Sequence, residues 1–192
     1  MRRLRARGYT VVELMMALAV FTTGVTGIVA MQRATASANR HARAVVVATG
    51  IAQAWLDQLT AESGLWRTDL SQTTWLKSIN TGSNDGNWQL PDFVAARRFG
   101  PRFNVFGEPD TDADDYCAQI RLTWLYPDEN NGGVPGTGVI RTEVRVFWLR
   151  DGASRVDEDC TGTSGATMTA VTGATDSYHF VHQAGAVAQH RN

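Results

Sequence analysis

The chain has 192 residues, of which 43% are hydrophobic and 19% charged, which suits a folded domain with an appendage and excludes wholesale disorder. A formal net charge of −1 excludes the global basic field of nucleic-acid binders, so nucleic acid is not expected as a partner. The charge is uneven, because four arginines precede the first apolar run. Without residues 1–8 the chain keeps 14 basic and 19 acidic residues, a net charge of −5, so a processed protein would be mildly acidic.

An apolar run over residues 11–31 follows this basic leader. At about 1.5 Å per helical residue it spans a hydrocarbon core of roughly 30 Å, and the positive-inside rule places the N-terminus in the cytoplasm. Glu13 does not fit a plain anchor, because an ionisable side chain in lipid marks a function and needs a partner. Cleavage between Gly8 and Tyr9 would put a new α-amine about one helical turn before Glu13, where the helix dipole also favours a carboxylate.

These residues resemble the type IV prepilin family. The match is the string Gly8-Tyr9-Thr10-Val11-Val12-Glu13-Leu14, with basic residues before it and an apolar helix after it. The resemblance implies that a prepilin peptidase cuts after Gly8 and methylates the amine of Tyr9, and that Glu13 supports filament assembly. The family usually has phenylalanine where this chain has Tyr9, but both are aromatic and processing is expected to survive. The segment Gly24–Ile28 also resembles the PilV subgroup of minor pilins.

The resemblance implies an α+β, type IV pilin-like fold in four parts. These are a leader over 1–8, a transmembrane and filament-core helix over 9–31, an amphipathic helix over 32–63 that continues into the head, and a periplasmic β-rich head over 64–192. The implied role is that of a minor pilin in the inner membrane, single-pass, later carried to the pilus or cell surface. The implied partners are the prepilin peptidase, the assembly platform, other major and minor pilins, and the bilayer before assembly. No enzymatic activity, cofactor or metal is expected.

Two other functions stay open. A minor pseudopilin of a type II secretion system shares the same N-terminal pattern. An exported soluble binding protein with a conventional signal peptide is the other, since Ala36-Ser37-Ala38 has the form of a signal-peptidase site. Against it, the apolar run exceeds the usual length of about 7–15 residues and contains Glu13.

After the apolar run, helical spacing continues. Apolar residues recur every three or four positions and form one stripe: Ala34, Ala38, Ala42, Val45, Ala48, Ala52, Leu56 and Leu59. No proline precedes residue 90, so one helix from Tyr9 to about Glu62 is predicted, ending at Gly64 and packing its stripe on a sheet. Tryptophans in the following polar stretch are expected to attach loops to the core.

Period-two alternation predicts strands over 119–126 and 139–149, joined by a turn-rich connector into an antiparallel hairpin, with a third strand over 178–183. Cys117 precedes the first strand and Cys160 follows the second, and these two positions lie at one edge of such a hairpin. An even pair in an exported protein is usually a disulfide, as in the C-terminal region of pilins, which this resembles; two free thiols in a cytosolic protein are the alternative. The polar segment 161–175 is expected to be an exposed loop.

Other polar clusters carry little chemistry. The acidic segment 110–115 fails the EF-hand pattern, because Asp115 and Arg121 stand where glycine and an acid are needed, although a looser calcium site stays open. His179 and His182 would lie on opposite faces of a strand. Arg97, Arg98 and Arg102 with Phe99 and Phe103 are expected to form a solvated loop. No catalytic constellation stands out.

Overall fold

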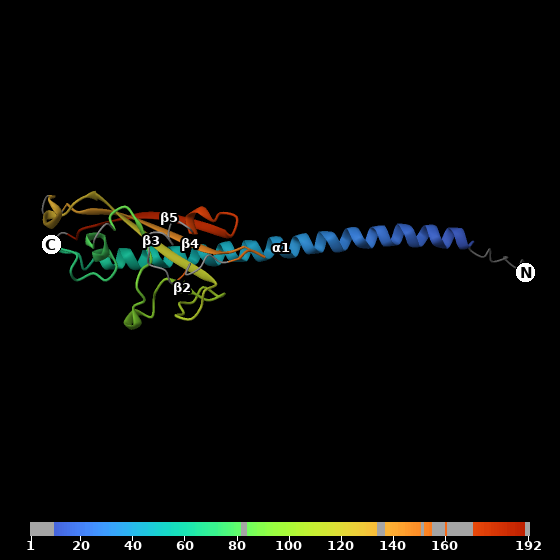
Figure 1. The fold of residues 1–192 in the computed structure, drawn as a ribbon, viewed down its shortest axis with the longest axis horizontal. Coiled ribbons are helices and arrows are strands. Elements are labelled where there is room, and N and C mark those ends of the chain that lie inside the picture. Colours follow the sequence, from blue (N-terminus) through green and yellow to red (C-terminus); the bar gives the residue numbers. More distant parts are fainter. Residues whose placement is uncertain are drawn as a thin grey trace, which may run out of the picture. The chain divides into compact units, whose positions relative to one another are not determined.

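The computed structural model describes residues 10–81, 84–133, 137–150, 152–154, 160 and 171–190. The chain divides into two compact units, Met1–Ala44 and Val45–Asn192, and one long helix, α1 (Val11–Ser63), belongs to both. The second unit combines the end of α1 with an antiparallel sheet (Figure 1). The expected α+β layout, a long apolar N-terminal helix with a sheet packed on its second half, is therefore present.

Helix α1 confirms the predicted helix to within two residues at each end. Its last turn ends where Gly64 and Leu65 donate their N–H groups to the carbonyls of Ala61 and Glu62, at 3.3 and 2.9 Å. The buried side of the helix consists of Ala48, Ile51, Ala52, Trp55, Leu59 and Glu62. The predicted stripe contains three of these positions but misses Ile51, Trp55 and Glu62, because a large aromatic and a charged residue do not look like members of an alanine stripe.

The sheet has five strands in the order β1-β3-β4-β5, with β2 also pairing with β3. The strands are β1 (Trp88–Gln89), β2 (Arg102–Phe103), β3 (Tyr116–Tyr126), β4 (Val139–Leu149) and β5 (Tyr178–Ala188). The predicted hairpin is confirmed: β4 has the expected bounds and β3 starts earlier than expected. The third strand is longer than predicted, because β5 pairs residue by residue with all of β4, from Leu149 opposite Tyr178 to Val139 opposite Ala188.

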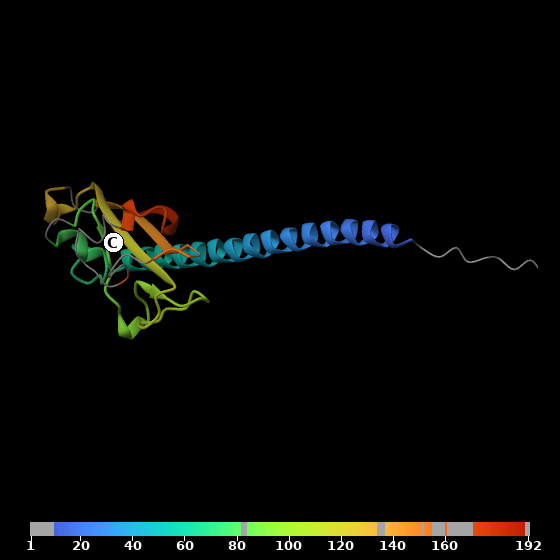
Figure 2. The same cartoon turned by 45° about the vertical axis from the view of Figure 1, so that its right-hand side comes forward.

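One face of this sheet packs on the helix and forms the core of the second unit. Ile120, Leu122 and Val144 point to that face and are almost fully buried. Figures 1 and 2 show β3, β4 and β5 side by side along the second half of α1. The alternation of apolar and polar residues that predicted these strands therefore corresponds to two faces of the sheet, because every second side chain of a strand points to the same face.

The stretch between α1 and β3 is irregular and holds two short 3₁₀ helices, η1 (Leu76–Asn80) and η2 (Ala95–Arg97); a third, η3 (Glu129–Asn131), follows β3. Trp66 and Trp75 are buried, which confirms that tryptophans attach this stretch to the core. The Trp75 ring lies 5.0 Å from that of Trp55 in α1, and the Phe99 ring lies 4.7 Å from the same Trp55. These aromatic contacts join the irregular stretch to the helix.

Candidate functional site

The start of α1 is a capping motif. Thr10 precedes the helix, and its Oγ1 accepts the backbone N–H of Glu13 at 3.3 Å, while its carbonyl accepts the first helical bond from Leu14 at 3.2 Å. A threonine followed three residues later by a glutamate is the sequence form of a capping box. Sequence reasoning missed this cap, in which the Glu13 backbone N–H is the donor, although the signal Thr-x-x-Glu was present. Gly8 and Tyr9, the predicted processing residues, lie outside the described residues.

The helix that follows Glu13 is apolar on all sides and exposed. Leu14, Leu18 and Phe21 each expose more than half of their surface, and α1 is long and apolar enough to cross a membrane. Signal sequences near an N-terminus meet the same criterion. The hydroxyls of Thr23 and Thr26 donate to carbonyls of the preceding turn at 2.8 to 3.1 Å. These donors are therefore satisfied within the helix and do not require water.

The two predicted cysteines form a disulfide. Cys117 lies at the start of β3, Cys160 follows β4, and their Cα atoms are 5.6 Å apart. Both are buried in a cluster with Phe147, Val171 and Tyr178. Of the expected exposed loop over 161–175, residues 161–170 lie outside the described residues; Thr172, Gly173 and Thr175 are exposed, and only Val171 among the described ones is fully buried. The disulfide attaches the chain to the sheet at Cys160, and the packing of Val171 in the same cluster attaches it again.

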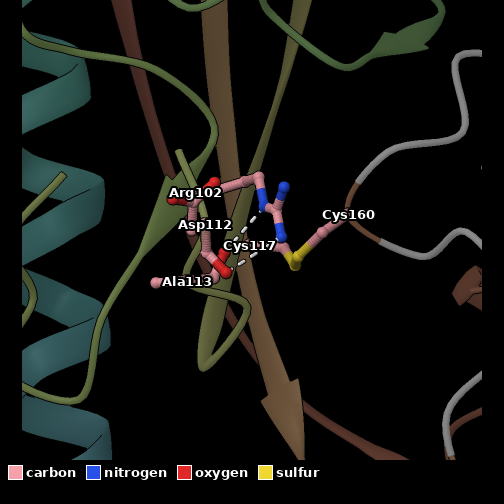
Figure 3. The surroundings of a disulfide bond; sticks show 5 residues. All are labelled: Arg102, Asp112, Ala113, Cys117 and Cys160. Carbon is pink, nitrogen blue, oxygen red and sulfur yellow. Dashed lines mark hydrogen bonds between the residues drawn. A yellow bond between two sulfur atoms is a disulfide. The ribbon is translucent and has the colours of Figure 1, made fainter. Parts of the chain in front are cut away.

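Arg102 lies beside the disulfide and attaches the acidic segment to the sheet (Figure 3). It is paired with Cys117 across β2 and β3, and its guanidinium donates to the carbonyls of Ala113 at 2.7 Å and Asp112 at 3.3 Å. The two carbonyls of the acidic segment therefore face the guanidinium cation of Arg102. Over the described part of the chain, no group of three or more metal-ligating side chains comes together. His179 and His182 lie on opposite faces of β5, as predicted.

A buried carboxylate joins α1 to the first loop, and sequence reasoning missed it. The Glu62 side chain is fully buried and accepts the backbone N–H groups of Thr74, Trp75 and Leu76 at 2.8, 2.9 and 3.1 Å. It also pairs with Arg97 Nη1 at 2.9 Å. Glu62 therefore satisfies, from helix α1, the backbone N–H groups at the N-terminus of η1, which a local capping side chain would otherwise do.

The expected solvated basic loop around Arg97 is solvated only in part. Arg97 pairs with Glu62, and its guanidinium lies 5.0 Å from the centre of the Trp75 ring. Phe99 and Phe103 are buried. Arg97 is therefore held to the head by an ion pair while its side chain stays 32% exposed, and Arg98 is exposed, as a solvated loop residue would be.

The sheet face away from α1 holds a second buried charge. Arg145 in β4 is 1% exposed, donates to Gln119 Oε1 and Thr172 Oγ1, and lies 4.4 Å from the centre of the Trp88 ring. Burial, with the neighbouring Arg121 as a second cause, lowers the pKa of Arg145 to about 10. Arg121 itself pairs with Glu143 at 2.7 Å, which holds the pKa of the Glu143 carboxyl below its usual value. Trp88, expected in a loop, lies over both arginines from β1.

His182 in β5 makes the stability of this face depend on pH. Burial lowers the pKa of His182, and the charges of Arg145 and Arg121 lower it further. The folded state therefore binds a proton on His182 less readily than the unfolded state, whose histidine titrates near pH 6.5. Stability is at its full value above this pH and falls as the pH drops through the unfolded pKa toward the lower folded one.

We expect the stability of His182→Gln to fall less than that of the wild-type protein as the pH drops through this range. The measurement is the unfolding midpoint of both proteins between pH 7.5 and 5, with the His182 titration followed by NMR. An identical loss of stability in the two proteins on acidification would contradict the assignment, as would a His182 pKa above the ordinary histidine value.

The capping motif and exposed apolar helix belong to the first unit, and the disulfide, Glu62 and Arg145 belong to the second. The disulfide, Glu62 and Arg145 have their partners in this same unit and act as structural connections. The Thr10–Glu13 motif is the strongest candidate for a function outside the fold, because it places a carboxylate at the start of an exposed apolar helix. The chain matches no protein-family model and shows no significant similarity to a curated protein or to a solved structure.

Proposed function

We propose that this chain is a type IV pilin-like subunit that is incorporated into a filament or primes it. The observation that carries the proposal is Glu13, an exposed carboxylate in the first turn of a helix that is otherwise apolar over a bilayer-spanning length. A carboxylate there is costly in lipid and needs a cation, and cleavage before Tyr9 would generate one in the neighbouring turn. The antiparallel sheet on the second half of α1 and the C-terminal disulfide support the same proposal.

In this proposal the subunit waits in the inner membrane with its head in the periplasm. A prepilin peptidase processes it at Gly8–Tyr9, and the assembly platform moves its apolar helix from lipid into a filament of other pilins. Contacts with neighbouring helices then replace contacts with lipid. A minor role suits the head, because the stretch between α1 and β3 is long, irregular and rich in tryptophan.

Glu13 variants test whether the charge is needed or only the cap. Glutamine can replace glutamate at the third position of a capping box, whereas it cannot pair with an ammonium group by charge. We expect Glu13→Gln to keep the full-length chain in the membrane at normal level but to remove it from sheared surface fibres. The comparison is an immunoblot of the membrane and sheared fractions from cells that make either protein.

Thr10→Ala is the matched control, since it removes the cap and leaves the charge. It should cost about 1 kcal/mol of local helix stability and keep the chain in the fibre fraction. Normal incorporation of Glu13→Gln would sink the charge-pairing role. Mass spectrometry of the wild-type N-terminus tests the rest of the proposal: methylated Tyr9 supports it, whereas a protein starting at Met1 or at Asn39 contradicts it.

A further inference from the structure

The second unit contains a cavity beside Trp75. It has a volume of about 400 Å³, is partly open to solvent, and lies between η1, the segment after β1 and the edge of β3. Ligand pockets have volumes of roughly 300–1,000 Å³ and combine apolar walls with a few convergent polar groups. The apolar part of this cavity is made by Ile120, Leu90 and Pro91.

The frame of the cavity is held in place by hydrogen bonds. Trp75 lines it, and its backbone N–H is held by Glu62 at 2.9 Å. The Trp75 indole Nε1 donates to the carbonyl of Asp92, another lining residue, at 3.0 Å. Trp75 therefore connects the segment after β1 to α1, which fixes these two parts of the lining relative to each other and reduces the conformational entropy lost on binding.

Several polar side chains around the cavity are unengaged. Gln89 Nε2 is buried and has no hydrogen-bond partner. Within the described part of the chain, no hydrogen bond or ion pair engages the side chains of Thr74, Lys77 or Asp92, which line the same cavity. A buried donor without a partner costs about 1–3 kcal/mol, so a group that supplies an acceptor for Gln89 gains this energy. The terminal torsion of glutamine is broad, so the carboxamide can turn its Nε2 toward the cavity at low cost.

We propose that this cavity binds a neutral, hydroxyl-rich ligand of the size of one sugar residue. The opposite charges of Lys77 and Asp92 balance, which disfavours a ligand with a net charge. Each hydroxyl of a sugar both donates and accepts, so one ligand can accept from Gln89 and Lys77 and donate to Asp92. Its C–H groups pack against the apolar side formed by Ile120, Leu90 and Pro91. This site is separate from Glu13 and does not depend on filament assembly.

The first test is binding of monosaccharides to the full chain, kept in a detergent without a sugar headgroup. Saturation-transfer NMR with a panel of neutral hexoses and N-acetylhexosamines should show at least one binder, with a dissociation constant of about 1 mM as expected for a ligand of this size. If no neutral sugar of the panel binds, the proposal is wrong. A charged sugar that binds more tightly than every neutral one also overturns the ligand class.

Gln89→Met then separates ligand binding from a structural role. Methionine has a similar shape but no hydrogen-bond donor. Because the Gln89 donor has no partner in the protein, its loss should leave the unfolding temperature unchanged or raise it. The affinity for the sugar should fall at least tenfold. Asp92→Asn keeps the backbone carbonyl that holds Trp75 and should also weaken binding. Gln53→Met, on the exposed side of α1, is the control and should change neither. Unchanged affinity in Gln89→Met, or a lowered unfolding temperature, contradicts the site.

Discussion

Replacement of Glu62 by alanine is expected to lower the free energy of unfolding of the head by about 3 kcal/mol or more. Alanine leaves the N–H groups of Thr74, Trp75 and Leu76 without their acceptor and leaves Arg97 without its partner. The Arg97 side chain is 32% exposed and can regain water, whereas the backbone groups of Trp75 and Leu76 lie in the core. Most of the loss therefore comes from the unsatisfied N–H groups. Chemical denaturation followed by tryptophan fluorescence measures it.

Two further variants show whether the buried carboxylate is the cause. Glu62→Gln keeps one side-chain oxygen as an acceptor, so it should lose less stability than Glu62→Ala. Asp57→Ala removes an exposed carboxylate of the same helix, which accepts a hydrogen bond from Gln53 at 3.0 Å, and should change stability by no more than about 0.5 kcal/mol. Equal effects of Asp57→Ala and Glu62→Ala would show that Glu62 is not the connection between α1 and η1.

Loss of the disulfide is expected to destabilise the head by up to about 4 kcal/mol in the chain-entropy model. The bridge closes a sequence separation of 43 residues, and both cysteines lie in an apolar cluster with Phe147, Val171 and Tyr178. The double variant Cys117→Ala, Cys160→Ala should therefore unfold at lower denaturant concentration. Protease should also cut it more readily in the segment between β4 and β5, because this segment then keeps only noncovalent contacts with the sheet.

Reduction provides the control for this second experiment. A thiol reductant should lower the unfolding midpoint of the wild-type protein toward that of the double variant, and should have no effect on the double variant itself. If the wild-type midpoint is the same with and without reductant under conditions in which both thiols become accessible to alkylation, the bridge does not stabilise the fold.

The sequence predicts the regular elements because their signals are local. The long helix follows from an unbroken apolar and alanine-rich run without proline, and the hairpin follows from alternation in residues 119–126 and 139–149. Strand β5 is underpredicted, because four of the five residues of its second half, Ala184–Ala188, are alanine or glycine, which have little β-propensity. Pairing with β4 extends it there, and tertiary context overrides propensity.

The connections between elements are not readable from the sequence. Glu62 looks like the polar end of a helix, and Arg97 looks like a solvated loop residue, until the fold brings them together over 35 positions. Trp88 and Arg145 are similarly separated in the chain and meet only because β1, β3 and β4 are neighbours in the sheet. Whether the Gln89 side chain finds a hydrogen-bond partner depends on its surroundings in the fold and cannot be predicted from the sequence.

The amino-acid order by itself determined the apolar helix with its early glutamate, the hairpin and the pair of cysteines available for a bridge. These depend on spacing along the chain, which a helix of 3.6 residues per turn or a strand of period two converts directly into a face. Only the tertiary structure decided the partners of Glu62, Arg97 and Arg145 and the cavity beside Trp75. The buried charges of Glu62 and Arg145 are tolerated because residues from other segments supply their hydrogen bonds, and no local pattern encodes that meeting.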